Sequence, residues 1–302
     1  MQAVVEHSPT PGASARKGKG AGFLLLSPAV LILLVWSLVP LGMTLWYSLL
    51  NYNLVDPTLH GFAGFSNYWY LLTDPDFLHS LLNTFILVAG VLVISVGGGT
   101  LLAVLYDQEF FGRGIARVLV ISPFFIMPTV SALLWKNLML HPIYGVYSAM
   151  MRAVGLTPID WLAQFPLLTV MMIVAWEWLP FAVLILLTAV QSLDSEQKEA
   201  ARMDGAGPVA QFRHIILPHL GRAISVVVMI ETIYLLTVFA EISVTTAGGP
   251  GVASTNLAYL IYSRALLQFD VGGASAGGVV AIIIANIVAV FLVRSVARNL
   301  EV

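Results

Sequence analysis

Charged residues are scarce in this sequence of 302 residues: Asp, Glu, Lys and Arg make up 10% of it, against 59% hydrophobic residues. A soluble domain needs roughly a quarter of its residues charged. Most of the surface of this chain must therefore face a lipid bilayer instead of water. The net charge is −2, so the sequence also lacks the basic excess that a nucleic-acid partner would require.

Cysteine is absent, which excludes disulfides, thiol catalysis and thiolate metal sites. The sequence has no Gly-x-x-x-x-Gly-Lys-[Ser/Thr] motif, so it cannot cradle ATP in a phosphate loop. It has no His-Glu-x-x-His either, and its six histidines fall in loops or near the ends of apolar stretches, which disfavours a metal site. We expect no catalytic residue, no cofactor and no metal in this chain.

Long apolar stretches are what the sequence does contain. A helix needs about 20 mostly apolar residues to cross the hydrocarbon core, and the stretches that qualify lie at about 22–50, 78–106, 114–140, 167–191, 220–246 and 272–296. These predict an all-α integral membrane protein with a bundle of about six transmembrane helices over residues 21–302. Residues 1–20 are polar and contain Gly, Ser and Pro, so they are expected to form a disordered tail. The apolar run after them is too long for a signal peptide and is predicted to be a retained first span.

The basic residues predict how the spans are oriented. With a cytoplasmic N-terminus, the inner segments hold eleven of them: Arg16, Lys17, Lys19, Arg113, Arg117, Lys198, Arg202, Arg213, Arg222, Arg294 and Arg298. The outer segments hold three, namely Lys136, Arg152 and Arg264. Cytoplasmic loops of membrane proteins carry an excess of Lys and Arg, so both termini are predicted to be cytoplasmic.

The longest polar stretch between spans, residues 192–222, is therefore expected on the cytoplasmic side. Asp194 or Ser195 can cap a short helix, and Gly205 can end it with a positive φ. A second short helix is predicted from Pro208, with Pro218 stopping it before the next span. Two short helices bent about a glycine would form a protruding knob that fits a groove in a partner.

The residues of this loop resemble the EAA motif of binding-protein-dependent ABC import permeases. Glu199-Ala200-Ala201 is followed after three residues by Gly205, then after nine by Ile215, and after one more by Leu217-Pro218. In that family the loop seats in a cleft of an ATPase subunit, so Glu199 would be the acidic contact and Gly205 the turn. The coupling residues implied by the resemblance are Glu199, Ala200, Ala201, Asp204, Gly205, Ile215, Leu217 and Pro218.

Other stretches are similar to the carbohydrate-importing branch of this family, and to its maltose-type F-like subunit. They are Phe65-Ser66-Asn67-Tyr68, Ser80-Leu81-Leu82-Asn83-Thr84, Gly248-Gly249-Pro250, Ser254-Thr255 and Tyr259-Leu260-Ile261-Tyr262. The run from Thr245 to Tyr262 with Phe269-Asp270-Val271-Gly272 looks closest to permeases for polyols such as sorbitol and mannitol. The resemblance implies a bacterial inner-membrane location and, as partners, a second permease, two ATPase subunits and a periplasmic solute-binding protein.

Three carboxylates lie inside apolar stretches, where an ionisable group costs at least ~2.5–3.5 kcal/mol and usually faces a cavity. Glu177 stands between Trp176 and Trp178, a combination that can bind the hydroxyls and apolar faces of a sugar; equally, Glu177 could bond to a neighbouring helix. Glu231, Tyr234 and Glu241 share one face of a continuous helix, as the wall of a water-filled passage or a surface that pairs with a second permease would.

Two other classes of membrane protein remain as alternatives. An ion-coupled secondary transporter could use Glu177, Glu231 and Glu241 as proton relays, but such transporters usually contain internal repeats, and none is evident. A channel or structural subunit has no filter-like motif in its favour. A permease for a solute other than a sugar also remains possible from the sequence.

Overall fold

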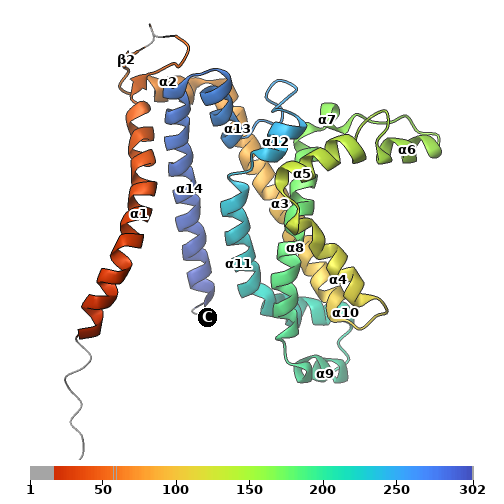
Figure 1. The fold of residues 1–302 in the computed structure, drawn as a ribbon. Coiled ribbons are helices and arrows are strands. Elements are labelled where there is room, and N and C mark those ends of the chain that lie inside the picture. The colour runs from red at the N-terminus through yellow and green to blue at the C-terminus, as the bar shows by residue number, and fades with distance from the viewer. Residues whose placement is uncertain (1–16, 57, 59, 301–302) are drawn as a thin grey trace, which may run out of the picture.

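The computed structural model describes residues 17–56, 58 and 60–300, and it confirms the predicted all-α membrane architecture (Figure 1). Five helices in the described part are long and apolar enough to cross a membrane, and a bent pair makes a sixth candidate. The five are Leu26–Tyr47 within α1 (Lys17–Tyr47), α3 (Pro75–Asp107), α8 (Pro166–Gln191), the helix Pro208–Leu235, and Val271–Arg294 within α14 (Val271–Leu300). The tail predicted to be disordered lies outside the described residues up to position 16, and Lys17–Gly20 are helical.

The stretch predicted as one span over 114–140 is instead broken. Helix α4 (Arg113–Ile121) and the short η1 (Ser122–Phe125) run up to a break, after which α5 (Pro128–Leu133) and the π-helical η2 (Leu134–Met139) leave at 102°. Pro128 is the cause, because it disfavours helical backbone in the residue before it. Met127 accordingly has an extended conformation, with φ −63° and ψ 137°.

The fifth span also differs from its prediction at both ends. Helix α10 (Pro208–Gln211), the π-helical η3 (Phe212–Ile216) and α11 (Leu217–Leu235) form one continuous helix of 28 residues, so the prediction that Pro218 stops a helix is wrong. The N–H of Leu217 bonds to the carbonyl of Phe212, and this wider turn accommodates the proline ring. Towards 246, α11 ends early and a break precedes the separate α12 (Ala240–Thr245).

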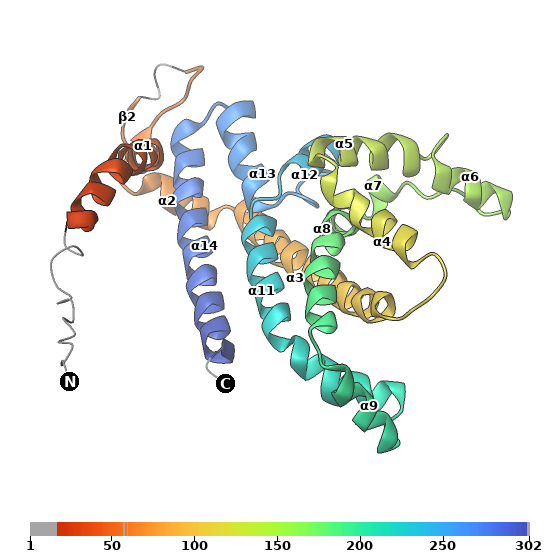
Figure 2. The ribbon, with the colours of Figure 1, turned by 60° about the horizontal axis from the view of Figure 1, so that its bottom comes forward.

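Helices α3 and α8 form the core of the bundle, and α11 packs against both. A Cβ added to Gly99 of α3 would lie 2.7 Å from Cβ of Ala182 in α8, so the two backbones approach as closely as small residues allow. Two apolar clusters follow each other along these helices, one around Val91 and Val174 and one around Ala103 and Leu186. Figure 2 shows α3 passing behind α8 and α11.

The ends of the bundle differ in structure. One end holds β1 (Leu50–Asn51), β2 (Gly61–Phe62), α2 (Ser66–Thr73), α6 (Val146–Ala153), α7 (Trp161–Gln164), α13 (Leu257–Tyr262) and η4 (Ser263–Leu267). An ion pair between Arg264 and Asp74 ties η4 to the start of α3 at this end. The opposite end holds α9 (Ser195–Met203), the first turn of α1 and the last turn of α14 (Figure 1).

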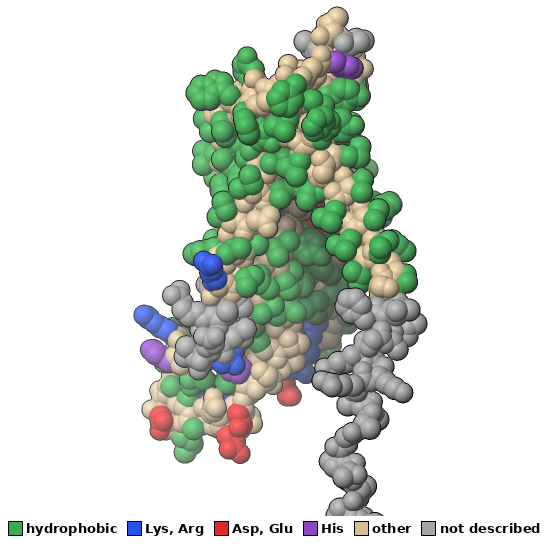
Figure 3. Space-filling model, turned by 90° about the vertical axis from the view of Figure 1, so that its left-hand side faces the viewer, with side chains coloured by type: hydrophobic (Ala, Val, Ile, Leu, Met, Phe, Trp, Pro, Cys, Tyr) green, Lys and Arg blue, Asp and Glu red, His purple; other side chains and the backbone are tan. Residues whose placement is uncertain are grey.

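Large hydrophobic side chains cover the outside of the spans. In α1, Trp36 is 81% exposed, and its neighbours Leu33 and Val35 are also exposed. Figure 3 shows hydrophobic side chains over most of the face formed by α1 and α14, with charged side chains gathered at the end that carries α9. Such a surface matches a lipid environment between two aqueous faces.

Candidate functional site: the exposed knob and the intramembrane polar residues

The knob consists of α9, the turn at Gly205 and the start of the Pro208–Leu235 helix. The side chain of Asp194 caps α9 by accepting a hydrogen bond from the N–H of Glu196 at 3.0 Å. Gly205 has φ +80°, and the N–H of Ala206 bonds to the carbonyl of Ala201 at 2.9 Å, which closes the C-terminal turn of α9. The local structure predicted around Asp194 and Gly205 is therefore present.

The eight predicted coupling residues divide between the two arms of the knob. Glu199, Ala200, Ala201, Asp204 and Gly205 lie on α9 and its turn, and all but the half-buried Ala201 are exposed. Ile215, Leu217 and Pro218 lie on the fifth-span helix, where Ile215 is half-buried. Met203 and Val209, which stand on either side of the turn, are 88% and 79% exposed. These two are not among the predicted coupling residues, although apolar residues in a polar loop are a usable signal of a contact surface.

An ion pair joins the knob to the bundle. Nζ of Lys198 donates to Oδ2 of Asp107, the last residue of α3, at 2.7 Å. This contact was not predicted, because the two residues are 91 positions apart. No residue of α9 is buried, so this pair is a principal attachment of the short helix.

Glu231 pairs two helices. Its side chain is completely buried, and Oε2 accepts a hydrogen bond from the hydroxyl of Ser95 in α3 at 2.5 Å. Its other oxygen, Oε1, accepts no hydrogen bond within the described residues. In this structure Glu231 therefore joins α11 to α3 within the chain.

Glu177 and Glu241 lie close together on α8 and α12, with Ser131 of α5 as a third polar neighbour. Both carboxylates are buried, and Oε1 of Glu177 accepts no hydrogen bond within the described residues. The predicted polar stripe of Glu231, Tyr234 and Glu241 is not continuous, because α11 ends at Leu235 and Glu241 belongs to a separate helix. The structure thus places Glu241 beside Glu177 instead of beside Glu231.

The two tryptophans around Glu177 point in different directions, since residues two apart on a helix lie about 200° apart. The ring of Trp176 meets that of Trp135 in the bent span edge to face, with centroids 5.5 Å apart. Trp178 instead lies 5.0 Å from the ring of Tyr234 on α11. Tyr234 is exposed, so Trp178 and Tyr234 together form an aromatic edge at the surface of the bundle.

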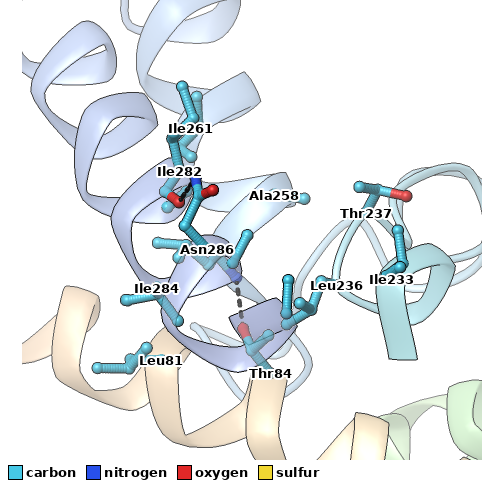
Figure 4. A pocket seen from close by; sticks show the side chains of 14 residues that line it. Leu81, Thr84, Ile233, Leu236, Thr237, Ala258, Ile261, Ile282, Ile284 and Asn286 are labelled. Atoms are coloured by element: carbon cyan, nitrogen blue, oxygen red, sulfur yellow. Dashed lines mark hydrogen bonds between the residues drawn. The ribbon is translucent and has the colours of Figure 1, made fainter. Parts of the chain in front are cut away.

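Two large, mostly apolar cavities lie elsewhere. One of about 440 Å³ is lined mostly by apolar side chains of α3, α11, α13 and α14, and the polar side chains of Asn286 and Thr237 also line it (Figure 4). Another, of about 320 Å³, lies between Trp135, Tyr147 and Trp161. Neither is lined by any of the six residues predicted for the substrate pathway: Trp176, Glu177, Trp178, Glu231, Tyr234 and Glu241.

Stretches that carried the sequence resemblance contact one another at the end opposite the knob. Nδ2 of Asn83 donates to the carbonyls of Val252 and Thr255, at 3.1 and 3.0 Å. Oγ1 of Thr84 accepts from the N–H of Leu257 at 2.9 Å. Nδ2 of Asn67 donates to two carbonyls at the end of the first span and its following strand. These motif residues therefore join separate segments at that end of the bundle.

Comparison with known families identifies the chain. Residues 95–302, more than half of it, match the model of the binding-protein-dependent transport system inner membrane component. The protein belongs to this family. It is accordingly a multi-pass transport component of the inner membrane, and the predicted resemblance to import permeases is confirmed.

Individual relatives extend the match over most of the chain. A probable ABC transporter permease, y4oQ of Sinorhizobium fredii, is 34% identical over 82% of this chain and 81% of its own length. The trehalose/maltose permease MalF of Thermococcus litoralis is 31% identical, covering 87% and 88%. The sn-glycerol-3-phosphate permease UgpA of Yersinia enterocolitica is 32% identical, covering 92% and 95%.

Two solved structures share the fold. A bacterial ABC transporter for alginate import superposes with a TM-score of 0.78 at 22% identity, covering 93% of this chain and 96% of its own. The alginate transporter in complex with an alginate-bound periplasmic protein gives a TM-score of 0.76 at 23% identity, covering 91% and 93%. At this identity the likeness supports the fold alone.

Proposed function

We propose that this chain is a pore-forming permease subunit of an ATP-driven importer for a sugar or sugar alcohol. It pairs with a second, similar permease and with two ATPase subunits, and a periplasmic solute-binding protein delivers the solute to the outer face. The chain itself hydrolyses nothing. Both termini and the 192–222 loop lie in the cytoplasm, on the face where the basic residues gather.

The observation that carries this proposal is the knob. It presents Glu199, Met203 and Val209 to solvent. It lies at the same end of the bundle as the first turn of α1 and the last turn of α14, which are also predicted to be cytoplasmic (Figure 1). An exposed pair of apolar side chains around a tight turn, next to an acidic residue, suits insertion into a groove of a partner. A secondary transporter would not need such a knob.

The solute class rests on relatives and on the aromatic edge. The relatives include permeases named for trehalose/maltose and for sn-glycerol-3-phosphate. Trp178 and Tyr234 offer ring faces for the C–H surfaces of a polyhydroxylated solute. We assign the solute passage to this edge, with Trp176, Glu177, Glu231 and Glu241 in the layer behind it, and we propose sorbitol or mannitol as the solute.

Uptake into proteoliposomes tests the importer function. With ATP inside, the full complex should accumulate solute, whereas a proton gradient without ATP should drive none. Glu199→Ala should lower ATP-driven uptake at least tenfold, while Glu196→Ala, an exposed residue of the same helix, should leave it near wild type. Uptake driven by the proton gradient alone would overturn the proposal in favour of a secondary transporter.

Competition identifies the solute. We expect unlabelled sorbitol or mannitol to block uptake of the labelled polyol, and maltose and sn-glycerol-3-phosphate to block it weakly. Tyr234→Ala should raise the half-saturating solute concentration, whereas Tyr70→Ala, an exposed tyrosine on α2, should not. Strong competition by maltose alone would replace the polyol with a disaccharide.

A further inference from the structure

The inner end of helix α3 is joined to the knob. Lys198 of α9 and Asp107 of α3 form the ion pair described above, with their side chains 21% and 26% exposed. Partial shielding from water strengthens such a pair relative to a fully exposed one. Within the described residues Lys198 is the one side chain of α9 bonded to a membrane span. A force on α9 therefore acts on the end of α3.

Helix α3 is one continuous helix that its neighbours hold in place. Its 33 residues contain no proline after the first position. Close packing at Gly99 and the hydrogen bond from Ser95 to Glu231 hold it to α8 and α11. From Asn83 to Asp107 it extends roughly 36 Å at 1.5 Å per residue, enough to cross the hydrocarbon core. Packed helices switch between discrete arrangements instead of deforming continuously, so a shift at one end of α3 is carried to the other.

The other end of α3 holds the loop of residues 246–256, here called the outer loop. Asn83 donates hydrogen bonds to the carbonyls of Val252 and Thr255, so it is bonded to the backbone of this loop and not to a side chain. The hydroxyl of Thr84, the next residue of α3, accepts a hydrogen bond from the N–H of Leu257, the residue that directly follows the loop. The tip of the loop, Pro250 and Gly251, is exposed. Displacement of α3 would therefore displace the outer loop.

We propose that α3 transmits the movement of α9 across the membrane to the outer loop, with Lys198–Asp107 as its inner joint and Asn83 as its outer joint. This inference rests on the proposed function, because it takes an ATPase as the source of the movement. Lys198, Asp107 and Asn83 are positioning residues that contact no solute. Their action sets the shape of the outer face in step with the state of the ATPases.

The native chain has no cysteine, so a single Ala253→Cys on the exposed side of the outer loop gives a specific reporter. In the full complex reconstituted in liposomes, with the other subunits free of reactive thiols, the rate of labelling by a membrane-impermeant maleimide is measured before and after trapping with ATP and vanadate. The labelling rate in the otherwise native chain should change on trapping.

Lys198→Glu and Asp107→Lys should each reduce the change in labelling rate on trapping at least fivefold. Fivefold is the lower end of the typical allosteric coupling between two sites. ATP hydrolysis and recovery of the complex should persist. The double variant with both substitutions, which restores the pair with its charges exchanged, should bring the change back to within about twofold of native. Asn83→Ala should abolish the change with the ion pair intact. Arg294→Glu, a charge reversal at the inner end of α14 and outside the 192–222 loop, should leave it unaltered.

The outcomes separate this inference from the importer proposal. If ATP drives uptake but labelling at position 253 does not change, or changes equally in Lys198→Glu, the transmission through α3 is refuted and the importer stands. Failure of the charge-exchanged double variant to restore the change refutes the inner joint, because Lys198 would then act on the ATPase itself. Absence of ATP-driven uptake in the native complex refutes both proposals.

Discussion

Two single residues, Lys136 and the buried Asn256, donate hydrogen bonds to backbone carbonyls near the breaks in the spans. Nδ2 of Asn256 donates to the carbonyl of Val238 at 2.6 Å, and its Oδ1 caps α13 by accepting from Tyr259. Nζ of Lys136 donates to the carbonyl of Val244 at 2.8 Å. A broken helix leaves carbonyls without partners, and in a membrane each such group costs several kcal/mol. These side chains therefore stabilise backbone that hydropathy alone would assign to a regular helix.

Replacing Asn256 by Asp tests this role. The new carboxylate can still cap α13, but it places an acceptor against the carbonyl of Val238, so we expect a loss of about 1–3 kcal/mol in the free energy of unfolding. Thermal unfolding of the purified chain in detergent measures it. Asn286→Ala is the control, since among the described residues that exposed amide bonds within its own helix alone. An unchanged midpoint in Asn256→Asp would show that the bond is unimportant.

Glu231 gives a second prediction at this scale. Glu231→Gln keeps an acceptor for Ser95 and should retain uptake within about twofold of native. Glu231→Ala leaves the hydroxyl of Ser95 unpaired and a cavity behind, so it should destabilise the chain by about 2–4 kcal/mol. Uptake assays and thermal unfolding measure the two effects. A large loss of uptake in Glu231→Gln with normal stability would instead indicate contact with solute.

For the elements, hydropathy located the apolar stretches but not their paths. The spans at 78–106, 167–191 and 272–296 agree with α3, α8 and α14 within a few residues at their described ends. The bend at Pro128 and the break after Leu235 could not be predicted, because apolar composition does not specify direction and the compensating bonds come from distant residues such as Asn256 and Lys136. Proline was an ambiguous signal: Pro128 starts a new helix, whereas Pro218 lies inside one.

Gly205 provides a prediction about the knob as an element. Its φ of +80° is unfavourable for any residue with a Cβ, so Gly205→Ala should strain the turn by about 1–2 kcal/mol. We expect faster hydrogen exchange in α9 and lower ATP-driven uptake. Gly207→Ala is a matched control two residues away, with φ −68° and no atom near the added methyl group. Equal behaviour of the two variants would show that the turn geometry does not matter.

In the whole molecule, the sequence resemblance identified the family and several residues that lie together, but not how they are joined. Asn83 and Ser254-Thr255 were recognised as separate motifs, and the structure shows Asn83 bonded to the backbone of the second. The coupling loop was predicted with its capping residue and glycine turn, which are local features. The Lys198–Asp107 pair and the Glu177–Glu241 proximity depend on tertiary packing and had no signal in the sequence.

Cross-linking from the knob tests the central claim most directly. With Met203→Cys as the one thiol of the chain, a membrane-impermeant maleimide should label inverted membrane vesicles and not intact cells. A photoactivatable cross-linker attached there should form an adduct with an ATPase subunit in the assembled complex. Labelling from the outside of the cell, or a correctly assembled and active complex without that adduct, would contradict the account.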